Sequence, residues 1–499
     1  MPGNGLVSLC FLGLENISYF RESQQNTPAL LSLFRINDPY RILGILFVLL
    51  LIRLPYFIFG QDLTVIELNW LLIGEKLADG GVMYRDVWDD TAPLSAGFFW
   101  LTDLVFGRSA LAHHIISLVL VWLQAAIFNN MLLQNKAYNE NTYVPALIYA
   151  LLMNIFFDFY SLSPLLLSQT FILLAINNIF RRIDNKTHDQ FFLNTGIFMG
   201  LASLFYLPAV LVFLALIVSL ILFTGSIFRR YMLLVYGFML PVSLCWLYYF
   251  WQDAHMEFFV QYIRSVLVLQ PTIYYSFGSF LMIVAVPVLF LLFAFYQLFR
   301  YSRYVNFQVR LQYVMIFVMA LCLLTFYFSK MFAPFQLIIF VPAFAFFISH
   351  YFLLIRRRLL AELAFLIFTL LLLGVNYGSA FNWSDLRSKL SFERLIVQEG
   401  PYDALVEGKR VLYVGSDKSV YKNSYHTTPF LDWDLSERVL REPDYYDNVV
   451  LLYRYFDTNA PEVVIDPEGL LVPYFERMPA VAARYQRSSL PDAWVLKAN

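Results

Sequence analysis

Long runs of apolar residues alternate with short polar segments along most of the chain, and this pattern predicts a bundle of membrane-spanning helices. A spanning helix needs about 20 mostly apolar residues, and its backbone groups must pair internally in lipid. About eleven runs reach or approach this length, the shortest being 144–158 and 191–203. The predicted spans are 41–59, 111–134, 144–158, 163–180, 191–203, 206–224, 231–250, 277–299, 312–328, 333–355 and 359–376.

Composition supports a polytopic membrane protein and excludes several other classes. Hydrophobic residues make up 60% of the 499 residues and charged residues 14%, whereas soluble domains contain about 45–50% and about 25%. The 50 Phe and 33 Tyr exclude intrinsic disorder. A net charge of −1 gives no electrostatic reason to bind nucleic acid. Three cysteines, of which Cys245 and Cys322 lie in apolar runs, do not form a disulfide framework.

The placement of Lys and Arg predicts the orientation of the bundle. With the N-terminus inside, the cytoplasmic segments hold about fifteen basic residues and the opposite loops about five, as the positive-inside rule requires. Residues 1–40 show no signal-peptide pattern, and we interpret them as a cytoplasmic arm. An odd number of spans in a membrane domain of residues 41–376 then places the tail on the outer side.

The tail, residues 377–499, has the charge balance of a water-soluble domain. Strand-like and helix-like segments alternate in it, which favours a small, largely parallel α/β sheet on the extracytoplasmic side. The predicted strands are 410–414, 463–466 and a last one near 494–496, and the predicted helices are 446–458 and 469–484.

The first external loop, residues 60–110, carries most of the candidate chemistry. Ile66, Trp70, Ile73 and Leu77 recur at helical spacing and predict an amphipathic helix on the membrane surface. Asp62 precedes this helix, close to the outer face of the membrane. A turn region bounded by Gly and Pro follows and contains three acidic residues, Asp86, Asp89 and Asp90.

This arrangement resembles the GT-C superfamily of membrane glycosyltransferases, which includes protein O-mannosyltransferases and lipid A aminoarabinose transferases. The features that carry the resemblance are the acidic residue and juxtamembrane helix from Asp62 to Leu77 and the segment Gly80 to Asp89. Further features are the Pro93-Leu94 helix start, the turn at 106–109, Lys330 before the Pro-containing late span, and the external α/β tail. The sequence around 162–165 and 200–203 also resembles an uncharacterised family of integral membrane proteins from the Bacteroidetes, which brings no function with it.

The resemblance implies an enzyme of the bacterial inner membrane that transfers a sugar from a polyprenyl-phosphate-linked donor. The acceptor, of unknown identity, attacks from the periplasmic side, where the tail also lies. Many GT-C members have adjacent acids at the start of this loop, whereas here Asp62 is followed by Leu63 and the next acid is Glu67. We expect Asp62, at the membrane interface, to act as the general base. Because the adjacent acid is missing, Glu67 and Asp86 are the alternatives.

The leaving phosphate needs cationic partners, because its negative charge grows as the glycosidic bond breaks. Lys330 and Arg85 are the candidates, since both ammonium and guanidinium groups bind phosphate. Further candidates for substrate contacts are Asp89, Asp90, Tyr274 and Gln336. No metal ligand set is predicted, although a divalent metal remains compatible with one or two acids.

Each candidate also has a structural interpretation. Asp62 is suited to capping the helix that follows it, and Asp86, Asp89 and Asp90 to a solvated turn. Arg85 has carboxylate partners nearby, and Lys330 can extend along the helix end to the interface. Asp158 lies at a predicted helix end. It either faces the same cavity as Asp62 or has only a structural role at the end of its helix.

Two other functional classes compete with the enzyme hypothesis. The first is a non-catalytic scaffold or envelope-assembly component of the inner membrane, which keeps the GT-C-like fold and binds an envelope protein through residues 377–499. The second is a secondary transporter, which the sequence favours less because it shows no convincing internal repeat and its polar residues gather near the outer face.

Overall fold

The computed structural model of the protein describes residues 30–60, 62–183, 189–264, 272–301, 304–490 and 492–497. Most of the predicted N-terminal arm therefore lies outside the described residues. The described chain begins with the short helix α2 (Leu30–Phe34). Glu362, in the last long helix of the bundle, accepts hydrogen bonds from the amides of Leu31 and Ser32 and so holds α2 against the bundle.

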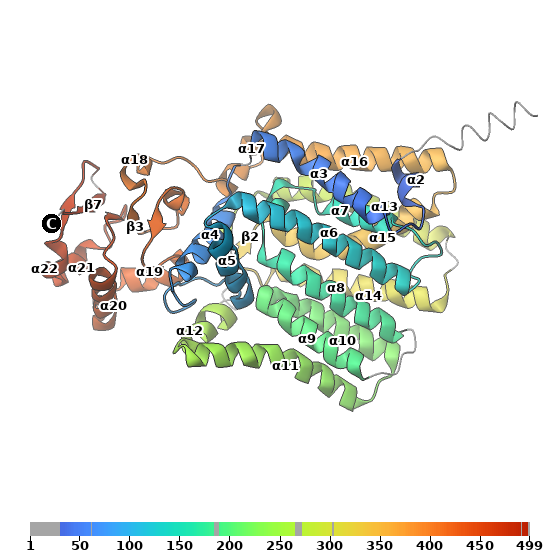
Figure 1. The fold of residues 1–499 in the computed structure, drawn as a ribbon, viewed down its shortest axis with the longest axis horizontal. Coiled ribbons are helices and arrows are strands. Elements are labelled where there is room, and N and C mark those ends of the chain that lie inside the picture. Colours follow the sequence, from blue (N-terminus) through green and yellow to red (C-terminus); the bar gives the residue numbers. More distant parts are fainter. Residues whose placement is uncertain are drawn as a thin grey trace, which may run out of the picture.

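Within the described residues, nine helical segments are long and apolar enough to cross a membrane. They lie side by side in Figure 1 and form the body of the molecule. These segments are α3 (Arg41–Phe59), α6 (Ala110–Gln134), α8 (Pro164–Ile183), η2 with α10 (Leu207–Thr224), α11 (Phe228–Trp251), α13 (Phe277–Tyr301), α14 with η5 (Asn306–Phe326), η6 with α15 (Pro334–Leu354) and α16 (Arg358–Ala380).

The two shortest predicted spans are helical but too short for this set, so the expected count of eleven is not confirmed. The first run contains α7 (Val144–Leu152), followed after a break by the 3-10 turn η1 (Phe157–Tyr160). All nine residues of α7 are buried, and the helix packs against α6 and α15. At 1.5 Å per residue it is about 14 Å long, which is half of the hydrocarbon thickness. It is therefore a core helix.

The second short run forms α9 (Gln190–Phe205), which packs closely against α11. A methyl group added at Gly196 would lie 2.1 Å from the backbone oxygen of Leu234, and one at Gly237 would lie 2.4 Å from that of Leu193. Such small residues let two helix backbones approach each other in a membrane. Glycine therefore sets the contact between α9 and α11.

The first external loop forms α4 (Val65–Ala78) and α5 (Pro93–Phe106). Residues 66–74 of α4 are all buried, so the prediction of an amphipathic surface helix is wrong: the helix is covered on every side. Its N-terminus is capped by Thr64, whose Oγ1 accepts a 3.1 Å hydrogen bond from the amide of Glu67. The alternative role of Asp62 as the cap of this helix is therefore also wrong.

The tail forms a mixed five-stranded sheet with strand order β4-β3-β5-β7-β6. The first three strands are parallel to one another, while β7 runs antiparallel to both β5 and β6, so the expectation of a largely parallel sheet is wrong for its second half. The strands are β3 (Arg410–Tyr413), β4 (Tyr425–His426), β5 (Val463–Ile465), β6 (Tyr485–Arg487) and β7 (Ala493–Leu496).

Helices pack on this sheet around a core that includes Leu412, Val464 and Phe456. The longer ones are α19 (Trp433–Arg441) and α20 (Tyr446–Thr458), and α20 matches the predicted helix 446–458. The predicted helix 469–484 is instead two short helices, α21 (Val472–Arg477) and α22 (Pro479–Ala482). The break falls at Pro479, because proline has no amide hydrogen to continue the first helix.

The tail domain and the first loop lie at the same end of the helix bundle, and α4 and α5 stand between the bundle and the sheet (Figure 1). Backbone contacts join them: the amide of Val397 donates to the oxygen of Leu63 at 3.0 Å, and Thr64 pairs with Ile396. Residues from three distant parts of the sequence therefore meet at this end.

Candidate functional site

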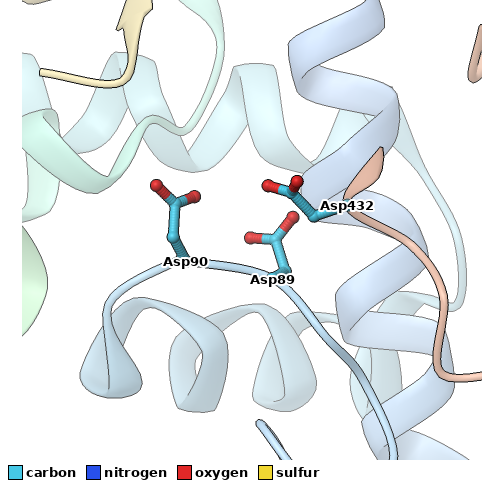
Figure 2. Close-up of side chains that lie close together, drawn as sticks. All are labelled: Asp89, Asp90 and Asp432. Atoms are coloured by element: carbon cyan, nitrogen blue, oxygen red, sulfur yellow. The ribbon is translucent and has the colours of Figure 1, made fainter. Parts of the chain in front are cut away.

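A short segment before α5 carries two adjacent acids, Asp89 and Asp90, into this junction. The segment is fixed by strand-like pairing with the tail: the amide of Trp88 donates to the oxygen of Pro429 at 2.7 Å, and the amide of Asp432 donates to the oxygen of Trp88 at 2.9 Å. This pairing brings Asp432 beside the two acids. Carboxylate oxygens of all three aspartates lie within 4.8 Å of one another. Figure 2 shows the three side chains close together.

Two lysines supply positive charge to this aspartate cluster. The Lys330 ammonium lies 3.7 Å from Asp90 Oδ2, and the Lys418 ammonium lies 3.9 Å from Asp89 Oδ2. Burial disfavours both ammonium groups, but the surrounding aspartates outweigh burial and raise the pKa of each lysine. Both lysines therefore stay charged at neutral pH.

Asp89 is held by protein groups on both of its oxygens. Its Oδ1 accepts from the Thr91 amide at 2.8 Å and from the Thr91 hydroxyl at 2.5 Å, and its Oδ2 accepts from Asn69 Nδ2 at 2.9 Å. Lys418 Nζ also donates to Asn69 Oδ1 at 2.7 Å, so α4, the acidic segment and the tail share one network. Because both of its oxygens accept hydrogen bonds from the protein, Asp89 holds the acidic segment in place and is not a free base.

Asp90 has a different environment. Across the described ranges no protein group donates a hydrogen bond to its carboxylate, whose one ion-pair partner is Lys330. Burial raises the pKa of Asp90 to about 6, against the lowering effect of Lys330, and the neighbouring Asp89 adds to the rise. A carboxylate with a pKa near neutrality and a free oxygen can accept a proton from a bound hydroxyl group.

Two cavities meet at Asp90, Lys330 and Met331, which line both of them. We call the first the polar cavity; it lies between the acidic segment and the tail. It is lined by Val65, Ile66, Asn69, Asp89, Asp90, Thr272, Tyr274, Lys330, Met331, Ser416, Lys418, Asp432, Trp433 and Asp434.

We call the second the apolar cavity, because most of its lining is aromatic or aliphatic. It extends among the outer ends of α8, α10 and α15. Its other lining residues are Trp70, Thr91, Ala92, Pro164, Phe205, Tyr206, Leu207, Pro208, Tyr262, Phe328, Ser329, Phe335 and Gln336. The Asp90–Lys330 pair thus stands where a polar and an apolar space meet.

The residues expected to bind substrate divide between these spaces. Asp89, Asp90, Lys330 and Tyr274 line the polar cavity, and Gln336 lines the apolar one. Arg85 does not line either cavity and pairs with Asp86 at 2.9 Å, as its structural interpretation expects. The amide of Val82 also donates to Asp86 at 2.9 Å, so Asp86 closes a turn.

The three residues expected as the general base do not line the cavity that contains Lys330. Asp62 is exposed and pairs with Arg387 at 2.5 Å in a separate small pocket beside α3 and α16. The expected convergence of Asp62 with Lys330 is therefore absent from the described part of the chain. The helix α3 ends at Gly60, and Asp62 pairs with Arg387 of the short helix α17 (Leu386–Lys389), outside both cavities.

Glu67 points into the protein and is fully buried, with its Oε1 2.9 Å from Nε2 of His114 on α6. Asp158, in η1, is also fully buried, and its Oδ2 accepts a 2.9 Å hydrogen bond from the amide of Phe335 at the start of η6. Burial raises the pKa of Asp158 to about 7; the Phe335 amide lowers the pKa and the Glu67 charge raises it. Both acids lie in the interior and line neither of the two cavities.

Sequence reasoning did not identify Asn69, Lys418 or Asp432. Lys418 follows Gly415-Ser416-Asp417 directly after β3, and polar residues at the carboxyl end of a parallel strand are a known signal for a binding site. No local pattern marks Asp432, which reaches the cluster solely through the pairing of its backbone with Trp88.

The aspartate cluster offers oxygen ligands that a hard divalent cation prefers. However, the ammonium groups of Lys330 and Lys418 already lie within 4.0 Å of two of the three carboxylates. A divalent ion would have to bind beside both positive charges. The residues present fit a salt-bridge network better than a metal centre, and a divalent metal stays a hypothesis.

No protein-family model matches the sequence, and no curated protein matches it. The structure is similar to the crystal structure of ArnT from Cupriavidus metallidurans bound to undecaprenyl phosphate, with a TM-score of 0.53 and 12% sequence identity over 91% of this chain and 96% of that one. Two oligosaccharyltransferase structures from Archaeoglobus fulgidus also match. One is the apo form, with a TM-score of 0.45, 10% identity and coverage of 90% and 73% of the two chains. The other, AglB with an inhibitory peptide and a dolichol-phosphate, has a TM-score of 0.46, 10% identity and coverage of 89% and 72%.

At 12% identity the likeness to ArnT, a GT-C protein, concerns the fold and not the chemistry. It extends over nearly the whole of both chains, including the helix bundle and the strand-containing tail. The sequence resemblance and the structural likeness agree: the chain is a polytopic helical membrane protein with the GT-C fold and a small C-terminal domain.

Proposed function

We propose that the protein is a membrane glycosyltransferase that transfers a sugar from a polyprenyl-phosphate-linked donor to an acceptor at the periplasmic face of the bacterial inner membrane. The observation that carries the proposal is the position of Asp90 and Lys330 between an apolar and a polar cavity. ArnT, which has the same fold, was crystallised with undecaprenyl phosphate. A donor with an apolar chain, a charged phosphate and a polar sugar needs a site that is apolar on one side and polar on the other.

In this mechanism the first isoprene units of the donor chain enter the apolar cavity and the donor phosphate binds Lys330. An acceptor hydroxyl in the polar cavity attacks the anomeric carbon, and the bond between that carbon and the phosphate oxygen breaks. Asp90 takes the hydroxyl proton, and the polyprenyl phosphate leaves with the bonding electrons. Lys330 offsets the charge that grows on the phosphate.

Binding of the donor also prepares the base. When the phosphate pairs with the Lys330 ammonium, the positive charge of Lys330 no longer lowers the pKa of Asp90. Its pKa then rises further, which makes Asp90 a stronger base for the acceptor hydroxyl. We assign the base to Asp90 in place of Asp62, Glu67 and Asp86, because those three do not line the polar cavity.

The test measures release of undecaprenyl phosphate from a panel of undecaprenyl-phosphate-linked sugars in nanodiscs. Asp90→Asn should lower the rate by about 10²–10⁴-fold, the usual contribution of a general base. Since Asp90 must be ionised, the wild-type kcat/KM, which reports the pKa of the free enzyme, should fall about tenfold per pH unit below about pH 6. Lys330→Met should weaken binding of undecaprenyl phosphate, and Lys330→Arg should partly restore it.

Asp62→Asn and Asp86→Asn serve as matched controls and should keep most of the activity. A large loss in Asp62→Asn together with full activity in Asp90→Asn would return the base to Asp62. If no sugar on the panel yields product and none of these variants changes lipid binding, the scaffold function with an envelope partner becomes the better account.

A further inference from the structure

The outer wall of the polar cavity belongs to the tail domain. Ser416, Lys418 and Asp432 come from the segment between β3 and α19, and Trp433 and Asp434 begin α19. The opposite wall comes from α4, the acidic segment and the region around Lys330. If the donor binds in the apolar cavity, the tail residues contact mainly the second substrate, which enters the polar cavity.

The charges of this cavity oppose a second anion. Asp89, Asp90, Asp432 and Asp434 contribute four negative charges, while Lys330 and Lys418 contribute two positive ones, a formal balance of 2 − 4 = −2. Each lysine already lies within 4.0 Å of an aspartate. Once the donor phosphate takes Lys330, Lys418 is left to offset all four carboxylates, and it is bonded to Asn69 and paired with Asp89.

The hydrogen-bonding groups of the cavity call for a ligand rich in donors. Ionised carboxylates only accept hydrogen bonds. Asp434 is exposed, and no side chain or amide in the described residues donates to it or to Asp90. From the described part of the chain, the Asp432 carboxylate accepts only a 3.3 Å hydrogen bond from the Leu435 amide at the start of α19. Several acceptor oxygens are thus free to receive hydroxyl hydrogens.

Aromatic rings complete this arrangement. Trp433 and Tyr274 line the same cavity, one from the tail and one from the strand β1 (Thr272–Ile273) region. Carboxylates for hydroxyl groups and rings for the apolar faces of a pyranose are the two kinds of group that an uncharged sugar needs. A protonated amine is the competing class of ligand, because the formal negative charge of the cavity attracts it.

We propose that the polar cavity is the acceptor subsite and that it binds an uncharged, hydroxyl-bearing sugar and excludes a phosphorylated one. This inference rests on the proposed function, because that function assigns the apolar cavity to the donor. Asp432, Asp434 and Trp433 then hold the acceptor hydroxyls and ring that do not react. The reacting hydroxyl faces Asp90.

The test is saturation-transfer difference NMR on the full-length protein in nanodiscs. The probes are the methyl glycosides of glucose, galactose and mannose, the matching hexose 6-phosphates, and glucosamine as a cationic sugar. At least one neutral glycoside should bind at least tenfold more tightly than its phosphorylated counterpart. Preference for a hexose phosphate, or binding of glucosamine with no neutral glycoside bound, would overturn the proposal.

Charge reversal at Asp434 tests whether the sugar binds in the polar cavity, and because Asp434 is exposed the change does not disturb the packed interior of the tail domain. Asp434→Lys should let the matching hexose 6-phosphate bind, and Trp433→Ala should weaken binding of the neutral glycoside at least tenfold. Asp447→Lys is the matched control, because Asp447 is exposed on α20 and does not line the cavity. Equal effects of Asp434→Lys and Asp447→Lys would place sugar binding elsewhere and reject the subsite.

Failure of this inference and failure of the proposed function give different results. Sugar binding at Trp433 needs no donor, whereas binding of undecaprenyl phosphate depends on Lys330. If the lipid binds and sugar is released while no neutral glycoside binds, the acceptor inference alone is wrong. If the glycoside binds and undecaprenyl phosphate does not, the cavity stands as a sugar site and the transferase proposal fails.

Discussion

At the scale of single residues, the environment of each acid decides its role, and that environment is set by residues distant in sequence. Asp89 and Asp90 are neighbours, yet Thr91 and Asn69 satisfy the first while the second faces Lys330. The sequence indicated that this acidic segment matters, but nothing in it distinguishes two adjacent aspartates. The difference depends on which side of an extended segment faces α4 and which faces the cavities.

Asp158 allows a test of burial through the dependence of stability on pH. Its pKa is raised to about 7 in the folded protein, above about 3.9 in an unfolded chain. The folded state therefore binds this proton more tightly, and the resulting stability is present below about pH 4 and is lost as the pH rises through 7. Asp158→Asn removes this titration. The thermal midpoint of the variant minus that of wild type should therefore increase as the pH rises from 5.5 to 8.5.

The measurement is the thermal unfolding midpoint of both proteins across that pH range in the same detergent. Asp447→Asn, which changes an exposed acid, should show a difference from wild type that is independent of pH. A constant difference between wild type and Asp158→Asn would mean that Asp158 is not protonated near neutrality.

At the scale of helices and strands, apolar run length identified the elements well. Each predicted span corresponds to a helical segment, and α20 has the predicted bounds. The predictions are wrong where other parts of the protein, and not water or lipid, surround an element. The helix α4 appeared amphipathic because its polar residues, such as Glu67 and Asn69, were expected to face water. Instead Glu67 lies 2.9 Å from His114, and Asn69 forms hydrogen bonds with Asp89 and Lys418.

The contact between α9 and α11 can be tested with a single methyl group. Gly196→Ala places a Cβ 2.1 Å from the backbone oxygen of Leu234, so the two helices must separate. Overpacking of this kind costs about 1–3 kcal/mol, and the thermal midpoint should fall. Gly374→Ala in α16 is the matched control, because its Cβ meets open space, and alanine favours a helix by about 1 kcal/mol over glycine. A midpoint equal to wild type in Gly196→Ala would contradict the close packing.

At the scale of the whole molecule, the site is shared between the membrane domain and the tail. Arg108, in the turn before α6, donates to the backbone oxygens of Tyr421, Lys422 and Ser424, and Lys76 donates to that of Thr427 at 2.8 Å. These contacts fix the segment that carries Lys418 and leads to Asp432. The tail is therefore part of the candidate site and not an appendage.

Removal of the Arg108 contact should loosen the tail and weaken the site together. In Arg108→Met, hydrogen–deuterium exchange of amides 419–426 should increase, and sugar transfer should fall because Lys418 is no longer held against Asp89. Arg229→Met, which changes an exposed arginine at the far end of the bundle, should alter neither quantity. Unchanged exchange in Arg108→Met would show that other contacts suffice to dock the tail.

The sequence alone determined that this chain is a helical membrane protein with an α/β tail, because long apolar runs and charge placement are local properties that depend directly on contact with lipid and water. The GT-C fold was only a resemblance at that level, and the structural likeness to ArnT supports it. The sequence also drew attention to Asp89, Asp90 and Lys330. Only the tertiary structure decided which residues share a cavity. The pairing of Trp88 with Pro429 and Asp432 places the tail over the first loop, and such long-range backbone contacts leave no periodic signal in the sequence.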